Sequence, residues 1–297
     1  MLDGVLETGA FQDLRDDPRV KPLRKQTPEG MRPAINDAAR LATGEFLMKC
    51  DGHCIFAEGF DATLKADCDG DWLVVPTRHS IAPETWTVCG PSGRKADLVN
   101  GGYNYHYLTF PYALSMYGYG IHGKTFEWKQ NCALNVETRA VQTDDLMSFQ
   151  GSCWFQPTEY FLRLGPLDHE AYYFYSESIE SGLRVWMSGG RCAINKKTWY
   201  AHYHKGRENV GADGRLGRGF YLDVRRKRQS EAYATDFWMN DKWPGATRTF
   251  AWLIDHFWPL LQRIPAREAW RWPEDWADPK YRFDFLNRPE DAIPAHT

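Results

Sequence analysis

Three short groups of polar residues could carry chemistry, and the first is Asp51-Gly52-His53, which follows an apolar run at residues 46–48. Residues i and i+2 of an extended segment point the same way, so the carboxylate and the imidazole can converge on one ion. A divalent cation held there would neutralise the charge that develops on a diphosphate leaving group. Taken alone, a D-x-H sequence is more often a polar turn, so the motif needs support from elsewhere in the chain.

The second group follows a predicted strand over residues 192–200. His202 and His204 alternate onto one face after this strand, where they could supply a third metal ligand. Two histidines near a strand end are a weak signal by themselves, and they gain meaning only beside the first group.

The third group lies in a predicted helix over residues 177–187. Glu177, Glu180 and Arg184 fall at helical spacing on one face. Such a helix would direct its N-terminal dipole and two carboxylates at whatever lies above it. The alternative is a surface helix with an i,i+4 pair between Glu180 and Arg184.

Apolar patterning predicts the elements that must position these groups. Helices are expected at residues 33–42, 59–65 and 158–164, and strands at residues 19–23 and 72–75. Helices that alternate with buried strands predict an α/β fold with a parallel sheet covered on both faces. An aromatic stretch over residues 100–130 is either a loop and strand packed on the sheet or a wall of an acceptor site.

Composition excludes several classes of protein. A chain of 297 residues with 43% hydrophobic residues can form one large α/β domain, and a net charge of −3 gives no general bias toward nucleic acid. The seven scattered cysteines argue against a disulfide framework. Because the sequence shows no signal peptide and no apolar run near the ~18 residues that span a bilayer, we expect a cytoplasmic protein.

Taken together, these motifs resemble those of a known family. The stretches at residues 30–36 and 42–47, followed by the D-x-H motif, resemble the GT-A glycosyltransferases of family 2. The D-x-H variant followed by Cys54, the Arg-Val-Trp-Met-Ser-Gly-Gly run at residues 184–190 and a histidine after the next strand are similar to the polypeptide N-acetylgalactosaminyltransferases. The resemblance covers roughly residues 16–205.

The resemblance implies an α/β fold of the GT-A type, a mixed sheet flanked by helices. Residues 1–225 would form this core, and residues 226–297 would form a Trp-rich C-terminal extension packed on it. Because Asp3-Gly4 and residues 16–20 look like the end of the family's second strand and the segment after it, the resemblance also implies that the first strand and helix are lacking.

It also implies roles for individual residues. Asp51, His53 and His202 would bind Mn²⁺ or Mg²⁺ and, with it, the donor diphosphate. The family's usual Glu-Asp pair reads Glu177-Ser178 here, so Glu177 or Glu180 would serve as the catalytic base, and the stereochemistry of transfer stays open. The implied donor- and acceptor-binding residues are Asp51, Gly30, Arg32, Asn36, Trp154, Arg184 and Lys205. Trp154 would form part of an acceptor wall, and the loop from Lys205 would close over the donor.

The predicted function is transfer of a sugar from a nucleotide diphosphate donor, expected to be UDP-linked, to a hydroxyl of a glycan. One alternative is a phage-type transferase acting on DNA bases, motivated by the basic run at residues 225–228. The other is a non-catalytic carbohydrate-binding or scaffold relic of the same fold.

Overall fold

The computed structural model describes residues 17–23, 25–27, 29–82, 84–89, 105–109, 121–125, 141–173, 177–203 and 224–262. Its strands are β1 (Phe46–Cys50), β2 (Cys54–Phe56), β3 (Trp72–Ala82), β4 (Thr87–Cys89), β5 (His106–Leu108), β6 (Gly123–Thr125), β7 (Thr143–Asp145), β8 (Cys153–Pro157) and β9 (Arg191–His202). Its helices are α3 (Met31–Leu41), α4 (Phe60–Ala66), α6 (Thr158–Leu164), α7 (His169–Tyr172), α8 (Glu177–Met187), α9 (Val224–Met239), α10 (Phe250–His256) and α11 (Trp258–Leu261).

The main sheet is mixed rather than parallel. Its strand order is β1-β8-β3-β9-β2, with β4 beside β3 and β7 beside β9. Of the pairs within it, β3 and β9 run parallel, whereas β8 runs antiparallel to both β1 and β3. The parallel sheet predicted from apolar patterning was therefore wrong, because apolar runs do not encode strand direction, whereas the mixed sheet implied by the resemblance is confirmed. Strands β1, β3 and β9 still point the same way, so their carboxyl ends lie at one edge.

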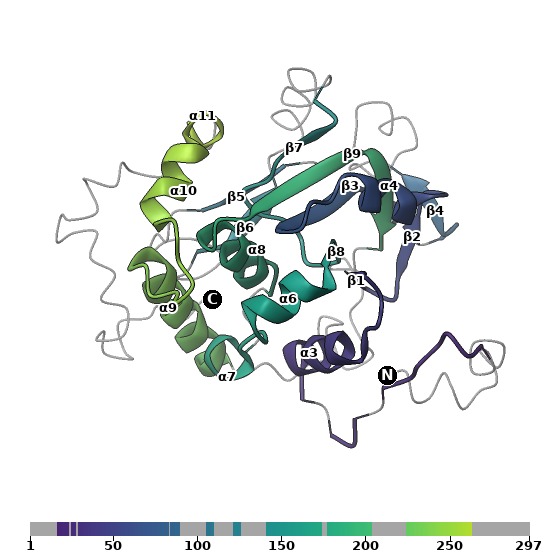
Figure 1. Ribbon diagram of the computed structural model, residues 1–297, viewed down its shortest axis with the longest axis horizontal. Coiled ribbons are helices and arrows are strands. Elements are labelled where there is room, and N and C mark those ends of the chain that lie inside the picture. The colour runs from purple at the N-terminus through teal and green to yellow at the C-terminus, as the bar shows by residue number, and fades with distance from the viewer. Residues whose placement is uncertain are drawn as a thin grey trace.

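The two faces of the sheet carry separate hydrophobic cores. Along β3, Leu73 and Val75 join the larger core, whereas Val74 between them joins the smaller one. This alternation is the period-two pattern of a strand buried on both faces. The larger core includes residues of α3, α6, α8, α9 and α10, and the smaller core includes Leu64 of α4. Figure 1 shows α3, α6, α8 and α9 grouped on one side of β3 and β9.

Most predicted elements form close to their expected bounds. Helices α6 and α8 have the predicted limits, and α4 is displaced by one residue. Strand β3 continues past residue 75 to Ala82. The strand expected at residues 19–23 is absent from the described residues, where a turn at Pro18 and Arg19 takes its place. Arg19 pairs with Asp17 there, a local contact that favours a turn over an extended segment.

The C-terminal helices complete the larger core. Trp238 of α9 and Phe250 and Leu253 of α10 are buried beside Trp186 of α8. The expected domain boundary at residues 225/226 falls inside α9, which begins at Val224. Of the helices that the structure describes, none combines the length and apolar character needed to cross a bilayer.

Candidate active site

The turn at residues 51–53 joins β1 to β2 at the edge where β1, β3 and β9 end. The backbone N–H of Asp51 donates to the carbonyl of Ser152 at 2.9 Å, and the N–H of Tyr203 donates to the carbonyl of His53 at 3.1 Å. The turn is thus fixed between the start of β8 and the end of β9. In α/β sheets, ligands bind beyond the carboxyl ends of strands.

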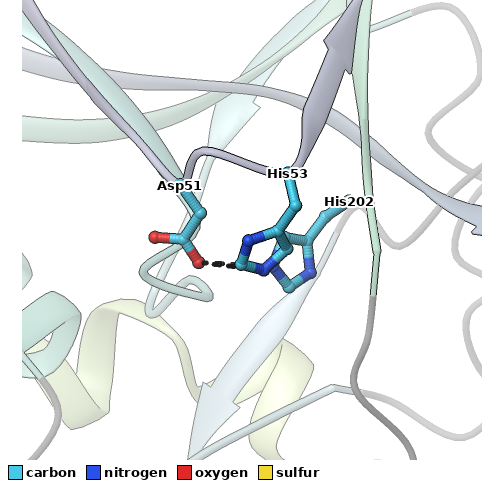
Figure 2. Close-up of side chains that lie close together, drawn as sticks. All are labelled: Asp51, His53 and His202. Carbon is cyan, nitrogen blue, oxygen red and sulfur yellow. Dashed lines mark hydrogen bonds and ion pairs between the residues drawn. The ribbon is translucent and has the colours of Figure 1, made fainter. Parts of the chain in front are cut away.

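The three predicted metal ligands converge at this turn (Figure 2). One donor atom from each of Asp51, His53 and His202 lies within 4.8 Å of the others. Nε2 of His202 is 3.0 Å from Nε2 of His53 and 3.2 Å from Oδ2 of Asp51. Two imidazole nitrogens with one carboxylate oxygen suit Mn²⁺ better than Mg²⁺, which prefers oxygen ligands. The donor set therefore fits a divalent transition-metal ion.

Lys49 organises the carboxylate of this group. Its ammonium donates to Oδ1 of Asp51 at 2.6 Å and to the carbonyl of Gly151, and it lies 3.6 Å from Oε1 of Glu177. Burial alone would raise the pKa of Asp51, but hydrogen bonds from His202 and Lys49 outweigh it and lower this pKa to about 2. Asp51 therefore stays ionised, with Oδ2 turned toward the imidazoles.

Glu177 begins helix α8 and is buried beside Lys49. Its Oε1 has no hydrogen-bond partner within the part of the chain that the structure describes. Burial raises the pKa of Glu177, although the charges of Lys49 and Arg32 oppose this shift. The carboxylate lies over Gly151, where an added Cβ would be only 2.0 Å from Oε1. The carboxylate of Glu177 can therefore occupy this position only because residue 151 has no side chain.

Glu180 lies one turn further along α8, in a buried ion-pair network. Nε of Arg32 donates to Oε2 at 2.7 Å. Oε1 accepts from the N–H of Asp168 at 2.9 Å and forms an ion pair with NH2 of Arg184 at 2.6 Å. A surface helix was the alternative for the pair of Glu180 and Arg184, but both side chains are buried. Both oxygens of Glu180 therefore have partners, and its pair with Arg32 links α3 to α8.

Other predicted binding residues also have structural partners. Asn36 of α3 exchanges two hydrogen bonds with the backbone of Leu167, and Arg184 donates to the carbonyls of residues 164–166. Gly30 precedes α3 with φ of 94°, a conformation that favours glycine. Trp154 is 0% exposed, so its indole is part of the core and not of an accessible acceptor wall.

Several predicted features lie outside the described residues. They include His204, Lys205, the loop that follows Lys205 to residue 219, and most of the aromatic stretch at residues 100–130. Within that stretch, Tyr105 and Tyr107 are described and are buried in the larger core.

Two residues of the site were not singled out from the sequence. Lys49 is a charged residue in an otherwise apolar strand, two positions before Asp51 and so on the same side of it. That spacing was a usable signal. Gly151 gave a weaker signal, because the need for glycine there comes from Glu177, which is distant in sequence.

Comparisons with known proteins fit this geometry. No family model matches the chain. Among curated proteins, it is similar to polypeptide N-acetylgalactosaminyltransferase 3 of Taeniopygia guttata, with 27% identity over 187 residues, which is 59% of this chain and 26% of that protein. It is also similar to probable N-acetylgalactosaminyltransferase 8 of Caenorhabditis elegans, with 24% identity over 204 residues, or 68% of this chain and 44% of that protein. The chain spans less than half the length of these relatives.

One solved structure decides the fold. The crystal structure of GalNAc-T7 with UDP, GalNAc and Mn²⁺ matches the chain with a TM-score of 0.57 and 16% sequence identity, over 81% of this chain and 40% of that one. The chain has a GT-A fold. The predicted ligands Asp51 and His202 therefore lie at the carboxyl edge of a GT-A sheet, next to the buried acid Glu177.

Proposed function

We propose that this chain is a metal-dependent glycosyltransferase that uses a nucleotide diphosphate sugar. The observation that carries the proposal is the convergence of Asp51, His53 and His202 within 4.8 Å at the carboxyl edge of a GT-A sheet. The structure of GalNAc-T7 contains UDP, GalNAc and Mn²⁺, which supports a UDP-linked donor and a manganese ion here as well.

The metal would be held by Oδ2 of Asp51 and Nε2 of His53 and His202. When bound, a divalent ion supplies positive charge that stabilises a departing diphosphate. Lys49 contributes a fixed positive charge beside the same carboxylate. It also occupies Oδ1, so one carboxylate oxygen remains for the ion. Carboxylates that ligate metals are commonly oriented by such neighbouring hydrogen bonds.

Glu177 is the residue that we assign as general base or sugar-contacting acid. Its Oε1 is buried without a hydrogen bond in the described structure, and burial raises its pKa above the ordinary value, which makes it a stronger base than an exposed carboxylate. Glu180 has no such free oxygen. We therefore propose that Glu180, Arg32, Asn36 and Arg184 support the site through α3 and α8 without contacting the substrate.

The acceptor in this proposal is a hydroxyl group. A glycan hydroxyl was expected from the sequence, whereas the name of the Taeniopygia guttata relative favours a polypeptide hydroxyl. DNA is less favoured. Within the basic run at residues 225–228, Arg226 forms an ion pair with Glu170 at 3.2 Å and stacks on Tyr173, so it is committed to contacts within the protein. A cytoplasmic location stays a prediction of the sequence.

Isothermal titration of UDP into the full chain, with and without Mn²⁺, tests the proposal. We expect UDP binding that requires Mn²⁺ and disappears in His53→Ala. Transfer from UDP-GalNAc to peptide and glycan acceptors would follow, and Asp51→Asn should abolish it. If neither UDP nor other nucleoside diphosphates bind in the presence of Mn²⁺, the scaffold relic replaces the enzyme as the favoured function.

A further inference from the structure

A cavity lies at the opposite end of β9 from the Asp51 site. It has a volume of about 300 Å³, and its lining includes Trp72, Asp145, Arg191, Arg248, Trp252 and His256. Arg191 begins β9, whereas the candidate metal ligand His202 ends it. On the neighbouring strand β3, Trp72 pairs with Arg191 and Ser80 with His202, so eight residue steps at ~3.3 Å place the two sites roughly 26 Å apart. The cavity is therefore a separate site.

Two guanidinium groups in this cavity lie over indole rings. Cζ of Arg191 lies 4.3 Å from the centroid of the Trp72 ring, and Cζ of Arg248 lies 4.3 Å from that of Trp252. The ring of His256 stacks on Trp252 at 4.9 Å. Stacking fixes the plane of a guanidinium and leaves its N–H edge to bind, which suits planar or tetrahedral oxyanions.

The two arginines of the cavity differ in whether they form an ion pair. Oδ1 of Asp145 pairs with Nε of Arg191 at 2.5 Å, and its Oδ2 pairs with Nε2 of His256 at 2.6 Å. Arg248 has no carboxylate partner in the part of the chain that the structure describes, and its NH1 donates to the carbonyls of Gly190 and Trp186. Asp71, the remaining acid of the lining, is exposed to water. Arg248 is therefore a half-buried cation with no ion pair to any residue that the structure describes.

We propose that this cavity binds an oxyanion, the phosphoryl or carboxylate group of a phosphate ester or an acidic sugar. Arg248 supplies a cation without an ion-pair partner among the described residues, and the guanidinium of Arg191 supplies further N–H groups from the same wall. The polar groups are already fixed by hydrogen bonds to Asp145 and to backbone carbonyls, so little ordering is needed on binding. The site does not depend on the glycosyltransferase assignment, because it shares no residue with the Asp51 group.

Isothermal titration of inorganic phosphate and of D-glucuronate into the metal-free chain at low ionic strength tests this site. We expect saturable binding of at least one probe, and the tighter probe identifies the phosphoryl or the carboxylate source. Arg248→Met should weaken binding at least about tenfold, because a charge-assisted hydrogen bond is lost. Arg163→Met, which removes an arginine stacked on Tyr160 of α6, should leave the affinity unchanged.

A substitution that should strengthen binding distinguishes a change at the site from a general loss of folding. Asp145→Asn removes the carboxylate that competes for Arg191 and His256, so it should tighten binding of the same probe several-fold. Asp51→Asn should have no effect, which distinguishes this site from the candidate metal site. The proposal is overturned if neither probe binds, if Arg248→Met binds as tightly as the unaltered chain, or if Asp51→Asn removes the binding.

Discussion

At the scale of single residues, Lys49 connects the metal-binding and acidic parts of the site. Its ammonium lies between Asp51 and Glu177, and its side chain is 11% exposed. Two carboxylates so close to one another would repel if this cation were removed. Lys49 is therefore required for the arrangement of both acids, whatever ligand they bind.

We expect Lys49→Met to lower the free energy of unfolding by about 1–3 kcal/mol in metal-free buffer, since it leaves two carboxylates without their shared cation. Urea unfolding measures this. The matched control is Lys65→Met, which breaks an exposed pair with Glu45 and should cost less than about 1 kcal/mol. Equal effects of the two substitutions would show that Lys49 has no special electrostatic role.

Glu177→Gln should make the protein more stable and less active. The folded state raises the pKa of Glu177 from its ordinary value of 4.5, mainly through burial. A raised pKa means that this group contributes stability below pH 4.5, and that this contribution is lost as the pH rises through the folded-state pKa. Glutamine avoids that loss, so its advantage should appear at pH 7.5 and disappear below pH 4.5.

Thermal unfolding at pH 7.5 and at a pH below 4.5 tests the stability of Glu177→Gln, and initial rates test its activity. Loss of a general base predicts a fall in turnover on the order of 10²–10⁴-fold. Full activity in this variant would exclude Glu177 as the base. A variant less stable at pH 7.5 than the unaltered chain would contradict the raised pKa.

At the scale of elements, helices α3 and α8 are joined through a buried carboxylate. Glu180 forms ion pairs with Arg32 of α3 and with Arg184 of its own helix, and all three side chains are buried. A buried ion pair is weak support for stability as a whole, but removing one partner leaves the others uncompensated. These ion pairs of Glu180 therefore hold α3 against α8.

We expect Glu180→Gln to lower the free energy of unfolding by about 3–5 kcal/mol, because two buried guanidinium groups lose their carboxylate. Asp37→Asn, which weakens partly exposed pairs on the same helix α3, should cost less than about 1 kcal/mol. Urea unfolding of both variants provides the comparison. Unchanged stability in Glu180→Gln, accompanied by lost turnover, would return Glu180 to the catalytic role expected from the sequence.

The sequence predicted elements better than it predicted their environment. The bounds of α8 follow from local apolar spacing, and so do the positions of Asp51 and His53 after a strand. Strand direction does not, because β8 enters the sheet between β1 and β3 through contacts that no local pattern contains. The burial of Glu180 was missed for the same reason, since its partner Arg32 is distant in sequence.

At the scale of the whole molecule, the C-terminal helices and the sheet share one core. Leu253 of α10 is 0% exposed and belongs to the same cluster as Leu73 of β3 and Trp186 of α8. A shared core predicts one cooperative unfolding transition for the two parts. The Trp-rich extension expected from the sequence would then not unfold as a separate unit.

Leu253→Ala should lower the free energy of unfolding of the entire domain by about 2–5 kcal/mol, through a buried cavity. Fluorescence and far-UV circular dichroism, followed in urea, should give coincident transitions for this variant. Leu162→Ala removes a side chain that is 48% exposed on α6, so it serves as the control and should change little. Two separated transitions would show that the C-terminal helices fold independently.

The pairing of β3 with β9 also determines when the site can form. Trp72 pairs with Arg191 and Ser80 with His202, so the central strands of the sheet come from distant parts of the chain. Contacts of such long range slow folding, because a large loop must close before they form. During synthesis, Asp51 and His53 leave the ribosome long before His202 does. A nascent chain therefore cannot bring Asp51, His53 and His202 together until β9 has been made.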